Sequence, residues 1–305
     1  MPALWKAVNL DLFSSLQVKQ NKRRGLWPSV SVVLTVLCLS TSPSAAQNVG
    51  VPSELSGRYQ AEMSSELSDD FNRLDTNKWE KRASKPRSDG AAGNIKARHN
   101  QFKSEGDTRY LSLLANKSGE AGLSARYPHR YGFTVCRWRI QGIELGVQHA
   151  AHPAIWSFSF NMGVSKINSP NPSGKTLEID WMEYIKWLKV PGYHARIIPA
   201  DNGISDTKRS VYMTQNQTDF DGWRIHGYEY TPEYVRLWEY VGDAWQTKGV
   251  KLYFTEATDV EGKKLDREYR SDQYFVLSNI WFYKPEYDLS PVRLDIDYLH
   301  HYPMR

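Results

Sequence analysis

The chain has 305 residues, of which 40% are hydrophobic and 13% aromatic, and its formal net charge is +5. A chain of this length and apolar content can bury a large core as one domain. The positive charge does not identify an anionic partner, because residues 1–46 hold five basic residues and one acidic residue, and the remaining 34 basic and 33 acidic residues leave a net charge of +1. Composition therefore predicts no nucleic-acid partner.

The N-terminus has the features of an export signal. KQNKRR (19–24) is basic, LWPSVSVVLTVLCL (26–39) is apolar, and SPSAAQ supplies small residues before a predicted cleavage after Ala46. The apolar segment is shorter than the roughly 20 residues that a membrane-spanning helix needs. We therefore expect 1–46 to be a signal peptide and the protein to be secreted, extracellular or periplasmic, without a membrane anchor. A lipid-modified Cys38 is an alternative that the preceding Val-Leu disfavours.

Residues 47–69 are polar and Ser-rich, which predicts a loose leader before a single domain over 70–305. Short strand-like runs separated by turn-rich segments then follow, without a long amphipathic helix or a fixed repeat. This pattern predicts an all-β fold, a curved jelly-roll sandwich of two antiparallel sheets with a concave cleft. The runs are YLSLLA (110–115), FTVCRWRI (133–140), AIWSFSF (154–160), LEIDWMEYI (177–185), YHARII (193–198), WRIHGYEY (223–230), YVRLWEYV (234–241), KLYFTEA (251–257), YFVLSNIWFY (274–283) and VRLDIDYLHHY (292–302).

Cysteine and aromatic residues carry two further expectations. Once Cys38 leaves with the signal, Cys136 is alone, so no internal disulfide forms, and its strand-like surroundings predict a packing role rather than a catalytic thiol. The eleven Trp and eighteen Tyr suit a groove in which flat rings stack on sugars, although core and sheet positions would also hold them.

The run LEIDWMEY places Glu178, Asp180 and Glu183 within six residues. Side chains at i and i+2 of a strand share a face, so Glu178 and Asp180 point together while Glu183 should point away. A β-bulge at Trp181 and Met182 would return Glu183 to the same face. Three acids on one concave face must separate their pKa values, which glycoside hydrolysis requires. A solvated polar strand face and a divalent cation site are the alternatives for the triplet alone.

Six segments in this order make the sequence similar to glycoside hydrolase family 16, over about residues 70–302. The matches are DDFNRLDTNKWE to the family's opening segment, RYGFTVCRWRI to YGxxExR, HPAIWSF to WPAxW, LEIDWMEY to the bulged ExDxxE signature, IHGYEYTPEYVRLW to YxxEWTPxxIxxY, and DIDYLHHY to VDYVRVY. The family includes laminarinases, agarases, porphyranases and κ-carrageenases. Val135 replaces a common Glu and Arg224 a common His, which weakens inference about the substrate more than about the mechanism.

The resemblance implies roles by position. Glu178 would be the nucleophile, Asp180 would orient it and help set the charge balance, and Glu183 would be the general acid/base. Trp156 would stack on a sugar next to the cleavage point, or else be a core residue. The further candidates for substrate binding are His194, Arg196, Trp187 and Trp281, each of which has an ordinary structural role as its alternative.

The favoured function is a secreted, monomeric, retaining endo-glycosidase that cleaves a β-linked galactan of the agar or porphyran kind, a polysaccharide partner. The aromatic, Arg-containing segment WEKRASKPRS resembles the agarase branch of the family, and Arg and His residues near the cleft could contact sulfate or anhydro-sugar oxygens, so both favour galactan. The alternatives are a laminarin-type β-1,3-glucanase, a κ-carrageenase and a non-catalytic carbohydrate-binding jelly roll. GxSxG, HExxH and a Gly-rich phosphate loop are missing from the sequence. No cofactor is expected for catalysis, and the resemblance permits a structural calcium at oxygen ligands such as Asp295 or Asp70.

Overall fold

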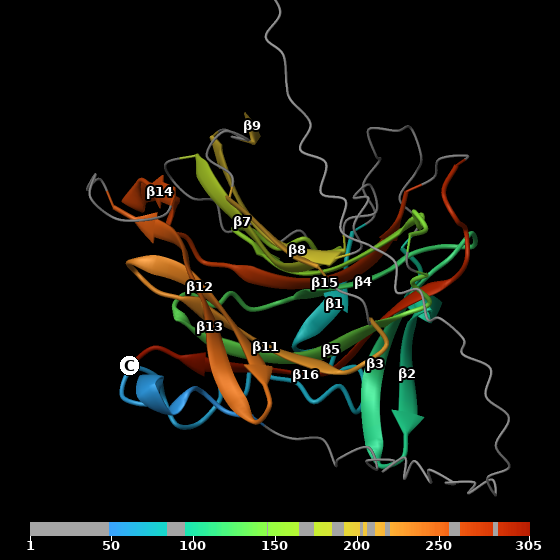
Figure 1. The fold of residues 1–305 in the computed structure, drawn as a ribbon, viewed down its shortest axis with the longest axis horizontal. Helices are drawn as coiled ribbons and strands as arrows, with labels where there is room; N and C mark the ends of the chain where they lie inside the picture. The colour runs from blue at the N-terminus through green and yellow to red at the C-terminus, as the bar shows by residue number, and fades with distance from the viewer. Residues whose placement is uncertain are drawn as a thin grey trace, which may run out of the picture. The chain divides into compact units, whose positions relative to one another are not determined.

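The computed structural model describes residues 49–305 except 84–94, 145, 165–173, 185–191, 202–203, 206–210, 217–219, 256–262 and 283–285. These residues form two eight-stranded sheets (Figure 1). Neighbouring strands are antiparallel, except that β13 and β14 are parallel. None of the helices in the described part of the chain is long and apolar enough to cross a membrane. The predicted all-β sandwich is confirmed.

The cleft lies on the first sheet, and the second sheet packs against the opposite face of the first. In spatial order the first sheet contains β1 (Trp79–Lys81), β4 (Ala121–Ala125), β15 (Tyr274–Trp281), β6 (Ala151–Phe158), β7 (Lys175–Tyr184), β8 (Gly192–Asp201) and β10 (Val211–Asn216), and β9 (Ile204–Ser205) pairs with β8. The second sheet contains β14 (Lys263–Leu265), β13 (Ala244–Phe254), β12 (Tyr234–Val241), β11 (Arg224–Tyr230), β5 (Gly132–Gln141), β16 (Val292–Pro303), β3 (Thr108–Ala115) and β2 (Asn100–Glu105). Three short 3₁₀ turns are η1 (Ser53–Leu55), η2 (Ala97–His99) and η3 (Arg267–Tyr269).

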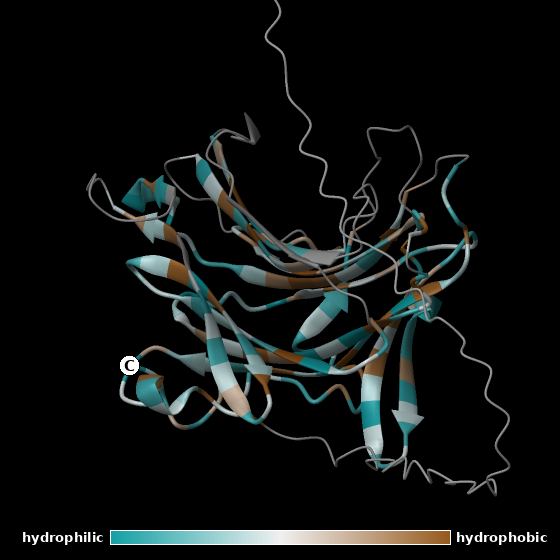
Figure 2. Cartoon of the chain, in the orientation of Figure 1, coloured by the Kyte–Doolittle hydropathy of each residue, from teal (hydrophilic) through white to brown (hydrophobic). Residues whose placement is uncertain are grey.

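Each of the ten predicted runs contains a strand, whereas β1, β2, β4, β9, β10 and β14 were not predicted. The missed strands are short or polar. β2, for example, reads NQFKSE and lies at a sheet edge, where no apolar face is needed. Alternating apolar residues along the long strands are visible in Figure 2.

The main core fills the space between the two sheets. Fully buried side chains come from both layers, with Leu111 and Leu294 from the second sheet and Ile179 and Leu277 from the first. Each such side chain contributes roughly 1.5–3 kcal/mol by leaving water. Cys136 belongs to this cluster, which confirms its packing role.

The segment 49–69 is not a loose leader, which corrects the sequence-based expectation. Val49, Leu55 and Tyr59 are buried against the outer face of the second sheet, where they meet side chains such as Phe133 and Trp238. The Tyr59 hydroxyl also donates to the buried carboxylate of Glu229 at 2.7 Å. Backbone bridges join this segment to β16. The packed unit therefore begins before residue 70, because its outer apolar face needs this cover.

Candidate active site

A β-bulge in β7 sets the geometry of the site. Asp180 pairs with Trp156 of β6, but the next pairing joins Met182 to Ile155 and Glu183 to Ala154, so Trp181 is the extra residue. The register toward β8 shifts over the same stretch. Trp181 and Met182 both turn into the core, where the Trp181 ring stacks on Tyr228 with centroids 4.7 Å apart. The predicted bulge is confirmed, and its location is the predicted one.

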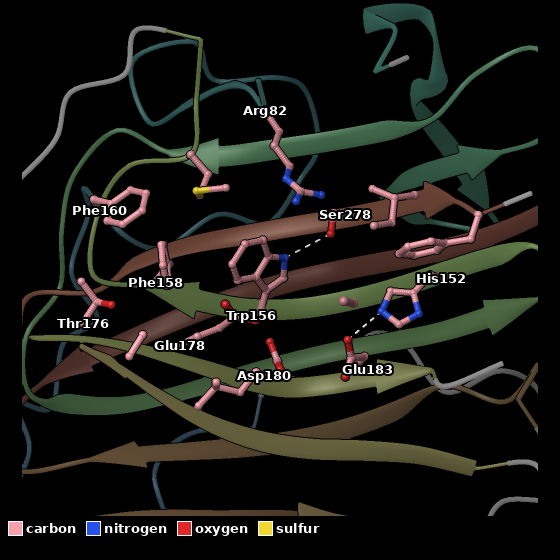
Figure 3. A pocket seen from close by; sticks show the side chains of 16 residues that line it. Arg82, His152, Trp156, Phe158, Phe160, Thr176, Glu178, Asp180, Glu183 and Ser278 are labelled. Carbon is pink, nitrogen blue, oxygen red and sulfur yellow. Dashed lines mark hydrogen bonds and ion pairs between the residues drawn. The ribbon is translucent and has the colours of Figure 1, made fainter. Parts of the chain in front are cut away.

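The bulge places the three acids on one face of the first sheet. Glu178, Asp180 and Glu183 line the same cavity of about 540 Å³, while Leu177 and Ile179, on either side of Glu178, face the core. All the lining side chains come from the first sheet or its connections, so the cavity opens on the face remote from the second sheet. Figure 3 shows the three carboxylates in a row along β7, with Trp156 beside them. The other lining residues are Arg82, His152, Ala154, Phe158, Phe160, Met162, Thr176, Ile198, Ala200, Ser278, Ile280 and Phe282.

Glu178 and Asp180 share a proton near neutral pH. Burial raises the pKa of Asp180 well above its usual range, and the charges of Glu178 and Glu183 add to the effect. Burial and the charge of Glu183 raise the pKa of Glu178 to about 7, although Arg196, Arg82 and a hydrogen bond with Asp180 oppose this rise. That hydrogen bond raises the pKa of Asp180 and lowers that of Glu178, which means that protonated Asp180 donates to the Glu178 carboxylate.

Glu183 has a different environment. His152 Nε2 lies 2.6 Å from Glu183 Oε1, and both side chains are largely buried. Burial raises the pKa of Glu183, but the charge of His152 and its hydrogen bond, together with Arg196 and His194, outweigh burial and lower it. The pKa values of the three acids therefore do separate: in the ligand-free protein Asp180 holds its proton and Glu183 is ionised.

Trp156 stands at the centre of the cavity. Its Nε1 donates to Ser278 Oγ at 3.1 Å, and the Arg82 guanidinium carbon lies 5.1 Å from its ring centroid (Figure 3). Trp156 clusters with apolar cleft residues such as Phe158 and Met162 rather than with the main core. It therefore lies in the cavity beside the acids, and its stacking on a sugar stays a prediction.

The other predicted binding residues have different placements. Arg196 and His194 lie directly opposite Asp180 and Glu183 in the β7–β8 register, so both share the face of the acids. Trp281 does not: it packs in the main core, which corrects its assignment as a binding residue. The reason is strand alternation, because Ser278 and Ile280 take the cleft-facing positions of β15. Trp187 lies outside the described residues.

Sequence reasoning missed His152 and Arg82. His152 occupies the first position of the HPAIW segment, where the family motif WPAxW has Trp, and that departure was the available signal. Arg82 belongs to the Arg-containing segment that favoured galactan, but nothing in the sequence places its side chain in the cleft.

The two residues named for calcium contact basic side chains, and a structural calcium stays a prediction. The fully buried Asp295 accepts from Arg139 Nε at 3.0 Å, and Asp70 contacts His300 at 2.6 Å. Within the described ranges, no group of three or more His, Cys, Asp or Glu side chains is arranged to hold a metal ion.

Comparison with known proteins finds the same fold among solved structures. No protein-family model matches the sequence, and no curated protein matches it. Among solved structures, the κ-carrageenase of Pseudoalteromonas carrageenovora is similar with a TM-score of 0.55 and 13% identity over 87% of this chain and 100% of that chain. A glycoside hydrolase family 16 endo-glucanase from Bacteroides ovatus is similar with a TM-score of 0.55 and 13% identity, over 77% of this chain and 99% of that chain. The catalytic domain of a laminarinase from Thermotoga petrophila is similar with a TM-score of 0.53 and 17% identity, over 81% of this chain and 99% of that chain.

The match covers nearly the whole length of each of these structures, which establishes the fold although the sequence identity is low. The chain has the two-sheet jelly roll found in family 16 glycoside hydrolases, as the sequence resemblance implied. The substrates of these neighbours differ, so the fold alone does not specify one.

Proposed function

We propose that this protein is a retaining endo-glycosidase that hydrolyses a β-linked galactan of the agar or porphyran kind. The observation that carries the proposal is the bulge that brings Glu178, Asp180 and Glu183 together in one cavity beside Trp156. The endo-acting, carbohydrate-cleaving neighbours with the same fold support it. Residues 1–46 are proposed to direct export, which N-terminal sequencing of the secreted protein would test by finding Gln47 first.

In the first step Glu178 attacks the anomeric carbon of the sugar. The bond from that carbon to the glycosidic oxygen breaks, and Glu183 gives its proton to the leaving oxygen. Asp180 supports the attack because its hydrogen bond lowers the pKa of Glu178 and so makes the ionised nucleophile available. The bound sugar would exclude further water, which favours the neutral, protonated form of Glu183 and opposes the lowering of its pKa by His152.

In the second step a water molecule attacks the same carbon and displaces Glu178, while Glu183 accepts the proton of the water. This step needs Glu183 ionised. His152 favours that state through its charge and its 2.6 Å contact with Glu183. We therefore assign His152 as a positioning residue that serves the second step.

On an aryl glycoside whose leaving group needs no proton from Glu183, the acid limb of kcat/KM should lie near pH 7. Glu178 must be ionised to attack, and its pKa is raised to about 7, so activity should rise as pH increases through this value. Asp180→Ala removes the hydrogen bond that lowers this pKa, so the limb should move to higher pH, whereas Asp180→Asn, which can still donate, should move it less. A pH profile of the three proteins measures this. An acid limb that stays at the same pH in the alanine variant would contradict the shared proton.

His152→Gln should slow the second step. Without the imidazole the pKa of Glu183 rises, so less of the general base is ionised, and a change of one pKa unit would cost about tenfold in rate below that pKa. With an aryl glycoside whose leaving group needs no proton, the steady state reports the second step, and the variant should show a burst followed by slower turnover. The defect should shrink as pH increases. A pH-independent loss without a burst would indicate a purely structural role.

The choice of galactan rests on the cationic and imidazole side chains around the acids, namely Arg82, Arg196, His152 and His194. Laminarin-type β-1,3-glucan and κ-carrageenan are the alternatives, since neighbours acting on them share the fold. Release of reducing ends from agarose, porphyran, κ-carrageenan and laminarin decides among them. Activity on laminarin alone would overturn the galactan assignment and keep the glycosidase.

A further inference from the structure

Arg82 is fixed over the first sheet by its backbone and its aliphatic stem. It follows β1, forms a bridge with Gly163, and its N–H donates to the Gly122 carbonyl at 3.1 Å. The stem lies across Gly122, since a Cβ built there would be 3.1 Å from Arg82 Cβ and 3.3 Å from Cδ. Only a residue without a side chain leaves this path open. The side chain thus reaches across the sheet to the ring of Trp156 on β6.

Within the described part of the chain, no carboxylate lies at contact distance from the guanidinium of Arg82. Among the described residues it forms no ion pair within 4.0 Å, and its buried Nε has no hydrogen-bond acceptor. Glu120 and Glu178 act on it only through longer-range attraction. Burial lowers its pKa to about 10, so it is still a cation at neutral pH. A partly buried cation whose Nε lacks an acceptor among the described residues is costly and calls for a ligand or a functional reason.

Two arginines on β5 are paired with carboxylates. Arg139 contacts Asp295 at 3.0 Å and Glu105 at 2.7 Å, and Arg137 contacts Asp297 at 2.5 Å. Arg82 differs because it faces the cavity of the candidate active site.

The position of Trp156 beside Arg82 indicates where a sugar ligand would bind in the cavity. A sugar bound at this ring would bring its substituents close to Arg82, whose guanidinium carbon lies over the ring, 5.1 Å from its centroid (Figure 3). A guanidinium binds a sulfate ester or a carboxylate through paired N–H donors. The acids lie on β7, whereas Arg82 follows β1 at the edge of the same sheet and reaches the cavity from that side.

We propose that Arg82 forms a subsite for an oxyanion substituent, a sulfate ester first of all, on the sugar that stacks on Trp156. This inference rests on the proposed glycosidase function and narrows its substrate to an anionic polysaccharide. Arg82 would then act in recognition, through KM, more than in the chemical steps.

The test compares one sulfated galactan oligosaccharide with the same oligosaccharide after solvolytic desulfation, and with one carrying a uronate. The assays are run above the acid limb so that Glu178 is ionised in every protein. The unmodified protein should prefer the sulfated substrate, and Arg82→Gln should lose roughly 10- to 100-fold in kcat/KM on it, mainly through KM, and far less on the desulfated one. Arg109→Gln, the same change at an exposed arginine of β3, controls for charge.

A preference for the uronate over the sulfate would identify the oxyanion as a carboxylate. Equal losses on sulfated and desulfated substrates would overturn the proposal and make Arg82 a countercharge for Glu178. If no oligosaccharide is cleaved, calorimetry on Glu178→Gln and on Glu178→Gln/Arg82→Gln separates the two questions. Tighter binding of the sulfated oligosaccharide that depends on Arg82 supports the subsite without catalysis, and sulfate-independent binding refutes it.

Discussion

Glu178→Gln is expected to reduce kcat by roughly 10⁴-fold or more while oligosaccharide affinity is largely kept. Glutamine is isosteric and can still hydrogen-bond with Asp180, but it cannot form the glycosyl-enzyme. The change also removes a negative charge that Asp180 feels, so the pKa of Asp180 should fall. Release of reducing ends measures turnover, and calorimetry with an uncleaved oligosaccharide measures affinity.

Glu62→Gln, at an exposed position outside the cavity, is the matched control and should behave like the unmodified protein. Near-normal turnover in Glu178→Gln would refute its role as nucleophile. If instead the unmodified protein binds oligosaccharides but never cleaves them, the chain is a carbohydrate-binding jelly roll, the class that the fold alone permits.

The sequence predicted the catalytic strand well because its signal is local. Three acids at 178, 180 and 183 can share a face only through a bulge, and the intervening apolar residues require that the other face be buried. Strand periodicity thus decides the geometry without knowledge of any neighbour. The ten long strands were predictable for the same reason.

The contacts across strands were not predictable in this way. His152 is 31 residues before Glu183, and only the β6–β7 register brings the two together. Trp281 shows a second limit: apolar residues occupy both faces of β15, because one face meets the core and the other the aromatic cleft. Alternation therefore could not tell which face Trp281 takes.

The N-terminal segment shows a third limit. Its few apolar residues, including Val49 and Leu55, are scattered in a polar, Ser-rich stretch that resembles a leader. They become buried only because the folded second sheet presents an outer apolar face made of distant strands. The sequence of the segment alone therefore cannot predict that these residues are buried.

Glu183→Ala should separate the two steps of the reaction. On a polysaccharide the loss should be roughly 10²- to 10⁴-fold, because the leaving oxygen is no longer protonated. On an aryl glycoside with a good leaving group the first step should persist, and the glycosyl-enzyme should accumulate because no base activates water. Azide, which needs no base, should restore turnover and give a glycosyl azide of retained configuration.

The configuration of that azide distinguishes the two glutamates. In Glu183→Ala, azide attacks a sugar already bonded to Glu178, so two displacements restore the original configuration. In Glu178→Ala, azide would instead occupy the place of the nucleophile and give the inverted product. Retained azide from the Glu178 variant, or inverted azide from the Glu183 variant, would exchange the two roles. Because the lowered pKa of Glu183 favours its ionised form in the ligand-free protein, this product analysis tests its role more directly than the resting protonation state can.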